Sequence, residues 1–337
     1  MSVRVSEVLF GKRAFWAAAL AGCACTVSSP THASENGASF YLLGSGGPEA
    51  AILPPVEGVF FDNTVYYYSG EAGAERELVV GGDVVLGLEG QVLADFATLL
   101  WVPSTDFIGG TLALGAALPI GYTKAEAGAV LTGPGGNQVS VSADDDAVIV
   151  ADPVLNAAIS WDVGGNWHVQ AGAMVNIPIG HYREDELANL SFHRWAVDTS
   201  FAASWHDAQL GWDVSGKVGV TFNGENDYTN YETGDELHFE AAIEKIFSPA
   251  FSAGAQFYYY DQISGDSGDG AVLGPNKGRV SALGVTAAYN FRLGKTPVTA
   301  RFRIFDEFDV ERRMDGTAAF FSLTLPLSMK MPAGQGA

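Results

Sequence analysis

The sequence has little cysteine and little positive charge. Its two cysteines, Cys23 and Cys25, both lie near the N-terminus, so a chain that loses that part can form no disulfide. Lys and Arg number 18 against 39 Asp and Glu, a net charge of −21. Such a balance argues against nucleic acid as a partner, because nucleic acid needs a basic face. After the N-terminal segment the chain has no uncharged apolar run of about 18 residues, which argues against transmembrane helices in the mature chain.

The first 33 residues have the layout of a secretory signal peptide. A basic start is followed by an apolar stretch over 14–25 and by small residues up to Ala33. The pattern predicts Sec-type export and cleavage after Ala33, and the apolar stretch is too short to span a bilayer. The alternative is a lipoprotein, since 20–23 resembles a lipoprotein cleavage box, and Cys23 would then be acylated and kept.

From residue 57 onward, apolar and polar residues alternate with a period of two in segments of strand length. This pattern is typical of tilted strands that cross an outer membrane. The predicted strands are 57–69, 82–97, 107–121, 148–161, 166–179, 194–205, 210–222, 236–246, 251–261, 279–291, 298–308 and 317–328.

The connections between these segments alternate in length. Short, turn-like connections follow the even-numbered strands, for example 162–165 and 206–209, and 102–106 is similar. Longer polar intervals mostly follow the odd-numbered strands, at 70–81, 122–147, 180–193, 223–235, 262–278 and 309–316. Short periplasmic turns opposite long extracellular loops are the arrangement of outer-membrane barrels. The fold class predicted is therefore an all-β, transmembrane, antiparallel up-and-down β-barrel of about twelve strands.

Each predicted strand has one apolar and one polar face. The apolar face suits lipid and the polar face suits a wet lumen, although each strand alone also fits a soluble sheet. Trp residues close to the short turns predict a periplasmic girdle, and Tyr66–Tyr68 with Tyr258–Tyr260 could form the other. The residues predicted to face the lumen are Asp152, Asn156, His168, Arg194, Asp213, Lys217, Glu236, His238, Glu240, Arg279, Arg301 and Arg303, together with Glu89, Asp95 and Glu244. Charges in a narrow lumen should pair across it, either as a stiffening ladder or as a selectivity constriction.

The two ends of the mature chain do not alternate. Residues 34–56 are rich in Gly and Pro, which disfavours helix and central strand. This segment is predicted to be either a plug inside the lumen or a loose periplasmic tail. The barrel is expected over 57–328 and a short C-terminal tail over 329–337.

Several motifs resemble the family known as "MetA-pathway of phenol degradation", which includes SphA-like outer-membrane proteins. They are 35–37 with 40–45, 152–155, 192–195, 221–226 with 231–234, 265–268 and 273–280. The resemblance covers the whole mature chain. It implies an outer-membrane barrel that helps small hydrophobic or aromatic compounds to cross, and it supplies no catalytic residues.

Catalytic and metal-binding patterns are weak. No Gly-x-Ser-x-Gly motif occurs, and the His residues have no evident Ser nucleophile beside them. The acidic runs 144–146 and 266–270 lack the spacing of a known calcium loop. The sequence therefore predicts no enzyme, no cofactor and no specific metal site.

Two functions remain. The first is an outer-membrane channel for passive uptake of small hydrophobic or aromatic solutes, which would bind near an extracellular mouth before moving through a polar lumen or a gap in the wall. The residues expected at that mouth are Asn223, Glu225, Asn226, Tyr258 and Tyr260. The second is a structural or ligand-binding barrel with a filled lumen, whose loops contact lipopolysaccharide. Outer-membrane lipid is the expected surrounding in both cases, and the oligomeric state stays open.

Overall fold

The computed structural model describes residues 35–80, 83–132 and 138–330, and the segment predicted as a signal peptide lies outside them. The described residues form strands and the segments that connect them, together with a short 3-10 turn, η2 (Glu35–Gly37). The barrel strands are β1 (Gly58–Val80), β2 (Asp83–Phe107), β3 (Gly110–Thr132), β4 (Gln138–Val150), β5 (Val154–Gly164), β6 (Trp167–Asn176), β7 (Ala196–Asp207), β8 (Trp212–Asn223), β11 (Glu236–Ser248), β12 (Phe251–Gln262), β13 (Arg279–Leu293), β14 (Thr296–Glu311) and β15 (Asp315–Met329). A small separate ladder joins β9 (Glu225–Asn226) to β10 (Tyr231–Glu232).

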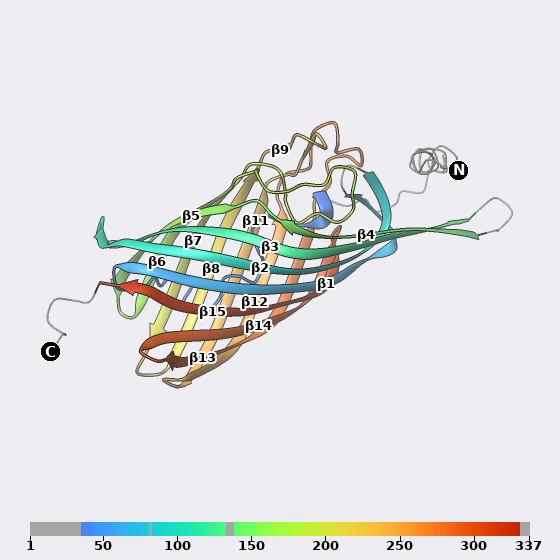
Figure 1. Cartoon of the computed structure of the whole chain (residues 1–337). Coiled ribbons are helices and arrows are strands. Elements are labelled where there is room, and N and C mark those ends of the chain that lie inside the picture. The colour runs from blue at the N-terminus through green and yellow to red at the C-terminus, as the bar shows by residue number, and fades with distance from the viewer. Residues whose placement is uncertain (1–34, 81–82, 133–137, 331–337) are drawn as a thin grey trace, which may run out of the picture. The chain divides into compact units, whose positions relative to one another are not determined.

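The sheet closes on itself. Every pairing is antiparallel, and β1 pairs with β2 on one side and with β15 on the other. Because β4 and β5 both pair with β3, the thirteen strands of the sheet occupy twelve positions around the barrel (Figure 1). A closed sheet leaves no exposed edge in the bilayer, which is what a membrane-spanning sheet requires. The structure confirms the predicted transmembrane barrel.

Two of the predicted loops are wrong. The segments 70–81 and 122–147 were expected as polar loops, yet β1 pairs with β2 up to Val80 and β3 pairs with β4 up to Thr132. The two hairpins therefore extend the wall well beyond the other strands at the long-loop end. The short connection expected at 102–106 lies instead at 108–109, where Ile108 has a positive φ of 54°.

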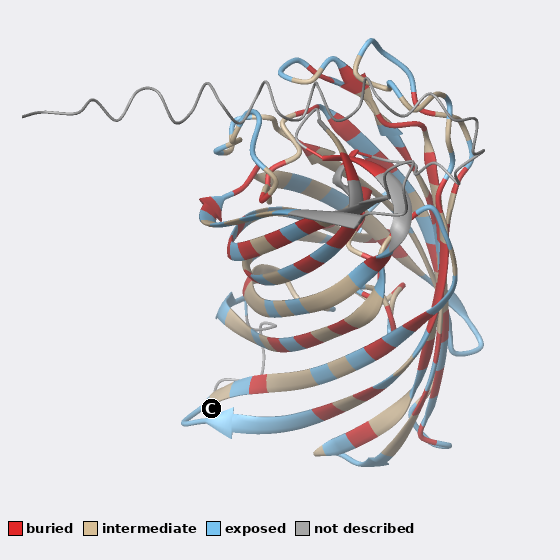
Figure 2. Ribbon diagram, turned by 90° about the vertical axis from the view of Figure 1, so that its right-hand side faces the viewer, coloured by how far each residue is buried: buried red, intermediate tan, exposed pale blue. Residues whose placement is uncertain are grey.

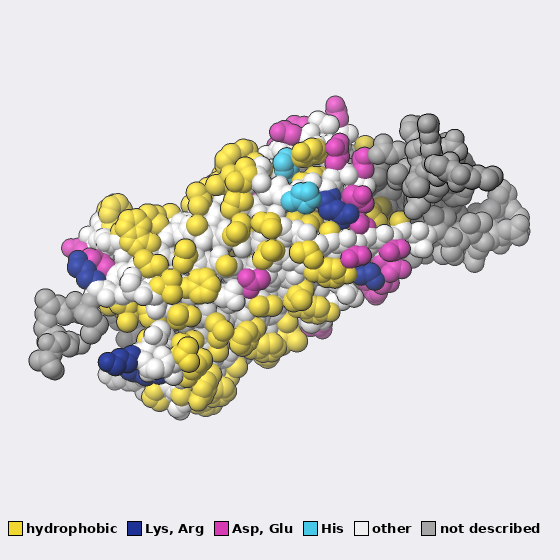
Figure 3. Space-filling model, in the orientation of Figure 1, with side chains coloured by type: hydrophobic (Ala, Val, Ile, Leu, Met, Phe, Trp, Pro, Cys, Tyr) yellow, Lys and Arg dark blue, Asp and Glu magenta, His cyan; other side chains and the backbone are white. Residues whose placement is uncertain are grey.

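The outer face of the barrel is apolar. Phe201, Val218 and Phe239 expose 49%, 42% and 40% of their surface. Exposed and buried positions alternate along the strands (Figure 2). Hydrophobic side chains form a wide belt across the face of the barrel that Figure 3 shows. Hydrocarbon, rather than water, is the environment that makes such a belt stable. Among the described residues, no helix is both long and apolar enough to cross a membrane.

Tryptophans gather near the short turns. Trp167 and Trp205 face each other on β6 and β7, and the Trp161 indole donates a hydrogen bond to the carbonyl of Ile108 at 3.1 Å. The predicted second girdle of tyrosines is largely wrong. Tyr258 and Tyr260 are each only 1% exposed, and they point inward with Tyr66 and Tyr68, because alternation sends every second residue of a tyrosine triplet to the same side.

Candidate functional site

Residues 35–57 run through the interior of the barrel. At the long-loop end, the Glu35 amide donates to Thr233, and the Glu35 carboxylate accepts hydrogen bonds from Asn226 and from Thr229 (2.7 Å). The Arg194 guanidinium lies 3.8 Å from the same carboxylate, and both side chains are 1% exposed. The N-terminal end of the described chain is therefore fixed at the mouth that the long loops surround.

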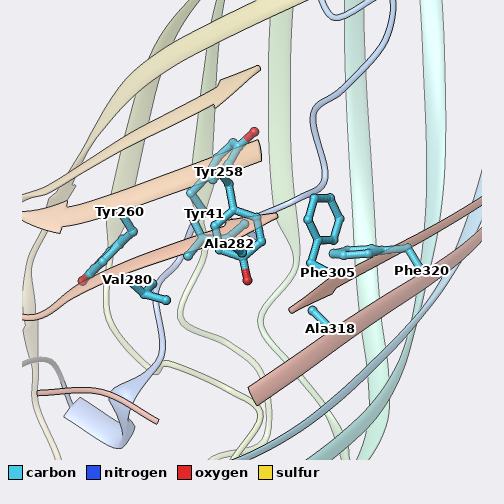
Figure 4. Packing of buried hydrophobic residues seen from close by; sticks show 9 residues of the cluster. Tyr41, Tyr258, Tyr260, Val280, Ala282, Phe305, Ala318 and Phe320 are labelled. Atoms are coloured by element: carbon cyan, nitrogen blue, oxygen red, sulfur yellow. The ribbon is translucent and has the colours of Figure 1, made fainter. Parts of the chain in front are cut away.

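In the middle of the bore, the segment packs on β11 and β14. Tyr41 stacks on His238, with ring centroids 3.5 Å apart, and it joins a buried aromatic cluster (Figure 4). The Gly44 amide donates to the Glu240 carboxylate at 2.8 Å, while Arg303 donates to the Gly44 carbonyl at 3.3 Å. Gly44 has φ +84°, and a Cβ there would lie 2.8 Å from the Phe305 ring. Only glycine suits this position.

Near the short-turn end, the segment binds side chains of β7 and β8. The Glu49 amide donates to Asp213 at 3.0 Å, and the Ala51 amide donates to Ser204 at 3.0 Å. Leu53 then packs in an apolar cluster with Phe60. Several interior polar groups thus pair with this segment, which hydrogen-bonds to the wall at the mouth, in the middle and near the short turns.

The mouth is covered by the loop 177–195, which folds against the inner face of the extended wall. Asp145 of β4 forms a two-pronged ion pair with Arg183, at 2.8 and 3.0 Å. Asp152, at the break between β4 and β5, is 1% exposed. Its carboxylate accepts hydrogen bonds from the backbone of Gly180, Phe192 and His193 and from the Asn176 side chain, at 2.8, 2.9, 2.8 and 3.1 Å.

A cavity of about 190 Å³ lies beneath this loop. Residues 37–43 of the N-terminal segment form one wall, and inward-facing side chains of β1 and β2 form another. Residues 189–192 of the covering loop lie above it. The lining is mainly apolar and aromatic, with a few polar groups, which is the usual character of a small-molecule site.

Burial raises the pKa of the Glu35 carboxyl above its ordinary value of 4.5, and the nearby Arg194 only partly opposes this. A raised pKa means that protonated Glu35 stabilises the fold below pH 4.5, and that this contribution is lost as the pH rises through the raised pKa.

We therefore expect the urea midpoint of the wild-type protein to fall, relative to that of Glu35→Gln, as the pH rises above 4.5. The matched control is Glu225→Gln, because Glu225 is an exposed neighbour of the cluster. The urea midpoint of this control should change with pH as that of the wild type does. Parallel pH profiles for the wild type and Glu35→Gln would contradict the expectation.

Most of the predicted lumen residues lie in the interior. Asn156 faces Met174, and His168 faces the buried Ser204. Lys217 lies 4.8 Å from the Tyr41 ring, and the ion pair of Arg301 with Glu244 crosses from β14 to β11. The interior set is Asp152, Asn156, His168, Arg194, Asp213, Lys217, Glu236, His238, Glu240, Arg301 and Arg303. Their role along a solute path stays a prediction.

Arg279, Asp95 and Glu89 depart from the predicted orientation. Arg279 faces Asp261, on the opposite side of the wall from buried Tyr260, and it pairs with exposed Glu311 at 2.8 Å. Leu283 and Val285 are 59% and 57% exposed, so regular alternation along β13 puts Arg279 on the outer face as well. Asp95 lies on the outer side and accepts a hydrogen bond from Asn63 at 2.7 Å, and Glu89 is exposed.

The residues expected at the mouth lie in different environments. Asn226 is fully buried against Glu35, and Asn223 accepts a hydrogen bond from Arg194 at 3.2 Å. Glu225 is exposed on β9. Tyr258 and Tyr260 lie within β12 rather than in a loop, and their hydroxyls donate to Glu307 and Glu236. The prediction that these two tyrosines lie at the extracellular mouth is therefore wrong. Their hydroxyl groups are already hydrogen-bonded inside the barrel.

Sequence reasoning missed Glu307 in the interior, where it accepts hydrogen bonds from two tyrosines. Alternation along its strand predicts Asp198 on the inward face, and the structure places it there, fully buried. Asp198 accepts hydrogen bonds from Thr221 and His238. Alternation could not identify Glu35 and Tyr41, because apolar and polar residues do not alternate in their segment. The residues that this segment contacts also lie far along the chain.

Among the described ranges, no group of three or more His, Cys, Asp or Glu residues is arranged to hold a metal ion.

The sequence profile of the family described as "MetA-pathway of phenol degradation" matches residues 78–323. No curated protein sequence matches the chain. The family match agrees with the resemblance in the sequence motifs.

Two solved structures are similar to this chain to different degrees. The COG4313 outer membrane channel from Pseudomonas putida F1 is 17% identical, with a TM-score of 0.65, over 83% of this chain and 99% of that one. A structure titled CymD monoaromatic hydrocarbon channel is 8% identical, with a TM-score of 0.41, over 85% and 94% of the two chains. The first likeness establishes the fold alone, and the second is too low to carry an argument.

Proposed function

The chain belongs to the family described as "MetA-pathway of phenol degradation", and from this premise we propose that it is an outer-membrane channel for passive uptake of small hydrophobic or aromatic compounds. It reaches that membrane by Sec-type export. Its apolar belt contacts membrane lipid, and its extended hairpins stand among the lipopolysaccharide. The N-terminal segment acts as a plug.

The apolar cavity beside the N-terminal segment is the observation that supports this proposal most strongly. The plug hydrogen-bonds to the wall at the mouth, in the middle and near the short turns. A wide water-filled path would favour ions and sugars, whereas a filled bore with one apolar, aromatic-lined cavity favours small apolar solutes.

The route of the solute follows from this geometry. A solute enters under the loop 177–195, rests in the cavity beside residues 37–43, and leaves when the plug shifts. The sequence carries no nucleotide-binding motif, so movement runs down a concentration gradient.

Uptake by a deletion strain tests the proposal. We expect cells that lack the gene to accumulate labelled single-ring compounds more slowly than the same cells carrying the wild-type gene. Uptake of a small hydrophilic sugar serves as the control and should be equal in both. Equal uptake of every hydrophobic compound tried would contradict the proposal.

A structural or ligand-binding barrel is the second candidate, and the filled bore supports it. The two candidates differ in one result. A structural barrel would leave uptake unchanged on deletion and would instead weaken the outer membrane, measured as entry of a large antibiotic that normally stays outside.

A further inference from the structure

The cavity beneath the covering loop has the size of a single aromatic ring with a small substituent. Its volume is about 190 Å³. An engineered protein cavity of about 150 Å³ lined by apolar side chains stays dry and binds benzene. The cavity here therefore has room for an aromatic ring with a substituent.

The walls of the cavity are shaped for a flat apolar molecule. Tyr66 of β1 lies with its ring centroid 6.4 Å from that of Phe96, edge to face at 74°. Val92 and Pro119 complete this side, and Met314 adds a flexible thioether. Aromatic rings bind other rings through edge-to-face and offset stacking, so this surface favours an aromatic solute over an aliphatic one of equal size.

The charged groups at the cavity are already compensated. The Glu307 carboxylate accepts hydrogen bonds from Tyr68 at 2.9 Å, from Tyr258 at 2.8 Å and from the Gly316 amide at 3.0 Å. Arg313, which also lines the cavity, lies over the Tyr260 ring at 4.1 Å. The Asp152 carboxylate, also on the lining, is likewise held by four hydrogen bonds, so a charged solute would have to compete with existing partners, and burial of an unpaired charge is costly.

Hydroxyl groups at the cavity are available, among them that of Ser191, which is buried without a hydrogen-bond partner in the described part of the chain. The Tyr66 hydroxyl makes no hydrogen bond within the described part of the chain, while the neighbouring tyrosine hydroxyls of Tyr68 and Tyr258 are both occupied. A partly buried hydroxyl without a partner favours a ligand that supplies one, because each unsatisfied polar group costs free energy.

Together these features lead to a substrate class. We propose that the cavity binds a neutral, single-ring aromatic molecule that carries one small hydrogen-bonding substituent, with the ring against the surface formed by Tyr66 and Phe96 and the substituent on the Tyr66 hydroxyl. This inference rests on the proposed uptake function and names the chemistry of its solute.

The direct test is diffraction from crystals of the full-length mature protein soaked with 4-bromobenzyl alcohol. We expect an anomalous bromine peak within the cavity. Crystals of Val92→Trp, in which the indole fills the cavity from the inward face of β2, should lack the peak. Leu93→Trp is the matched control, because Leu93 is the next residue of the strand and is 50% exposed on the outer face. This control should keep the peak.

Affinity measurements on the protein in lipid nanodiscs test the solute class. Tyr66→Phe should weaken binding of 4-bromobenzyl alcohol about fivefold, as expected for one hydrogen bond, and should leave bromobenzene unaffected. Tyr67→Phe, on the outer face, should change neither affinity. Binding of 4-bromobenzoate should be at least tenfold weaker.

The outcomes separate the two proposals. No bromine peak in the cavity, or a peak that survives Val92→Trp, would overturn the binding site. Equal affinity for 4-bromobenzoate, or no effect of Tyr66→Phe on the alcohol, would overturn the assigned class. In each case normal uptake by the wild-type strain and reduced uptake by the deletion strain would leave the uptake function standing, so the two failures are distinguishable.

Discussion

Removal of residues 36–52 is expected to raise the single-channel conductance in planar bilayers on the order of tenfold, because a twelve-stranded bore is wider than the eight-stranded barrels whose interiors side chains fill. The deletion takes away the groups that pair with Glu240, Asp213 and Ser204. Water and ions should replace them. The barrel should still close, since β1 pairs with β15 independently of this segment.

Two measurements keep this expectation testable. Heat-modifiable migration in gels shows whether the deleted protein still folds as a barrel. A truncation of residues 331–337, which lie outside the described part of the chain, is the control and should conduct as the wild type does. A folded deletion variant with unchanged conductance would show that the segment does not limit the path.

Substitution Asp152→Ala is expected to release the loop that covers the mouth. The carboxylate satisfies three backbone amides of this loop and one side chain. Each buried donor that loses its partner costs about 1–3 kcal/mol, so several kcal/mol of local stability should be lost. We expect trypsin to cleave after Arg183 in the variant at concentrations that leave the wild type intact.

The control for this substitution is Asp162→Ala. Asp162 is exposed in a short turn and accepts a hydrogen bond from the Gly164 amide at 2.8 Å. Its loss should leave the loop protected. If Asp152→Ala resisted trypsin as the wild type does, the loop would be held by other contacts, and Asp145 with Arg183 would be the first to examine.

The membrane-spanning part of each strand could be predicted from the sequence, because lipid outside and polar groups inside impose a strict period of two. The extended hairpins could not. There the apolar residues are either small, such as Ala125 and Ala127, or consecutive, such as Val79 and Val80, so the contrast between the two faces almost disappears. The acidic run at 144–146 also reads as a loop, although Asp145 turns inward to Arg183.

The candidate site was harder to predict than the barrel. Alternation identifies inward-facing charges such as Glu240, but it cannot say what they bind. Their partners belong to a segment with no period, and the hydrogen bond from Gly44 to Glu240 spans 196 residues. Arg279 was assigned to the lumen because it is charged, although alternation with the exposed Leu283 and Val285 puts it on the outer face.

The central claim is that solute passes through the small apolar cavity rather than through an open, water-filled bore. The most direct measurement is the uptake rate of a labelled neutral single-ring compound by deletion-strain cells that carry equal amounts of wild-type, Val92→Trp or Leu93→Trp protein. The account predicts that Val92→Trp lowers the rate to that of cells without the gene, while Leu93→Trp restores it fully. Equal rates with all three proteins would contradict the account.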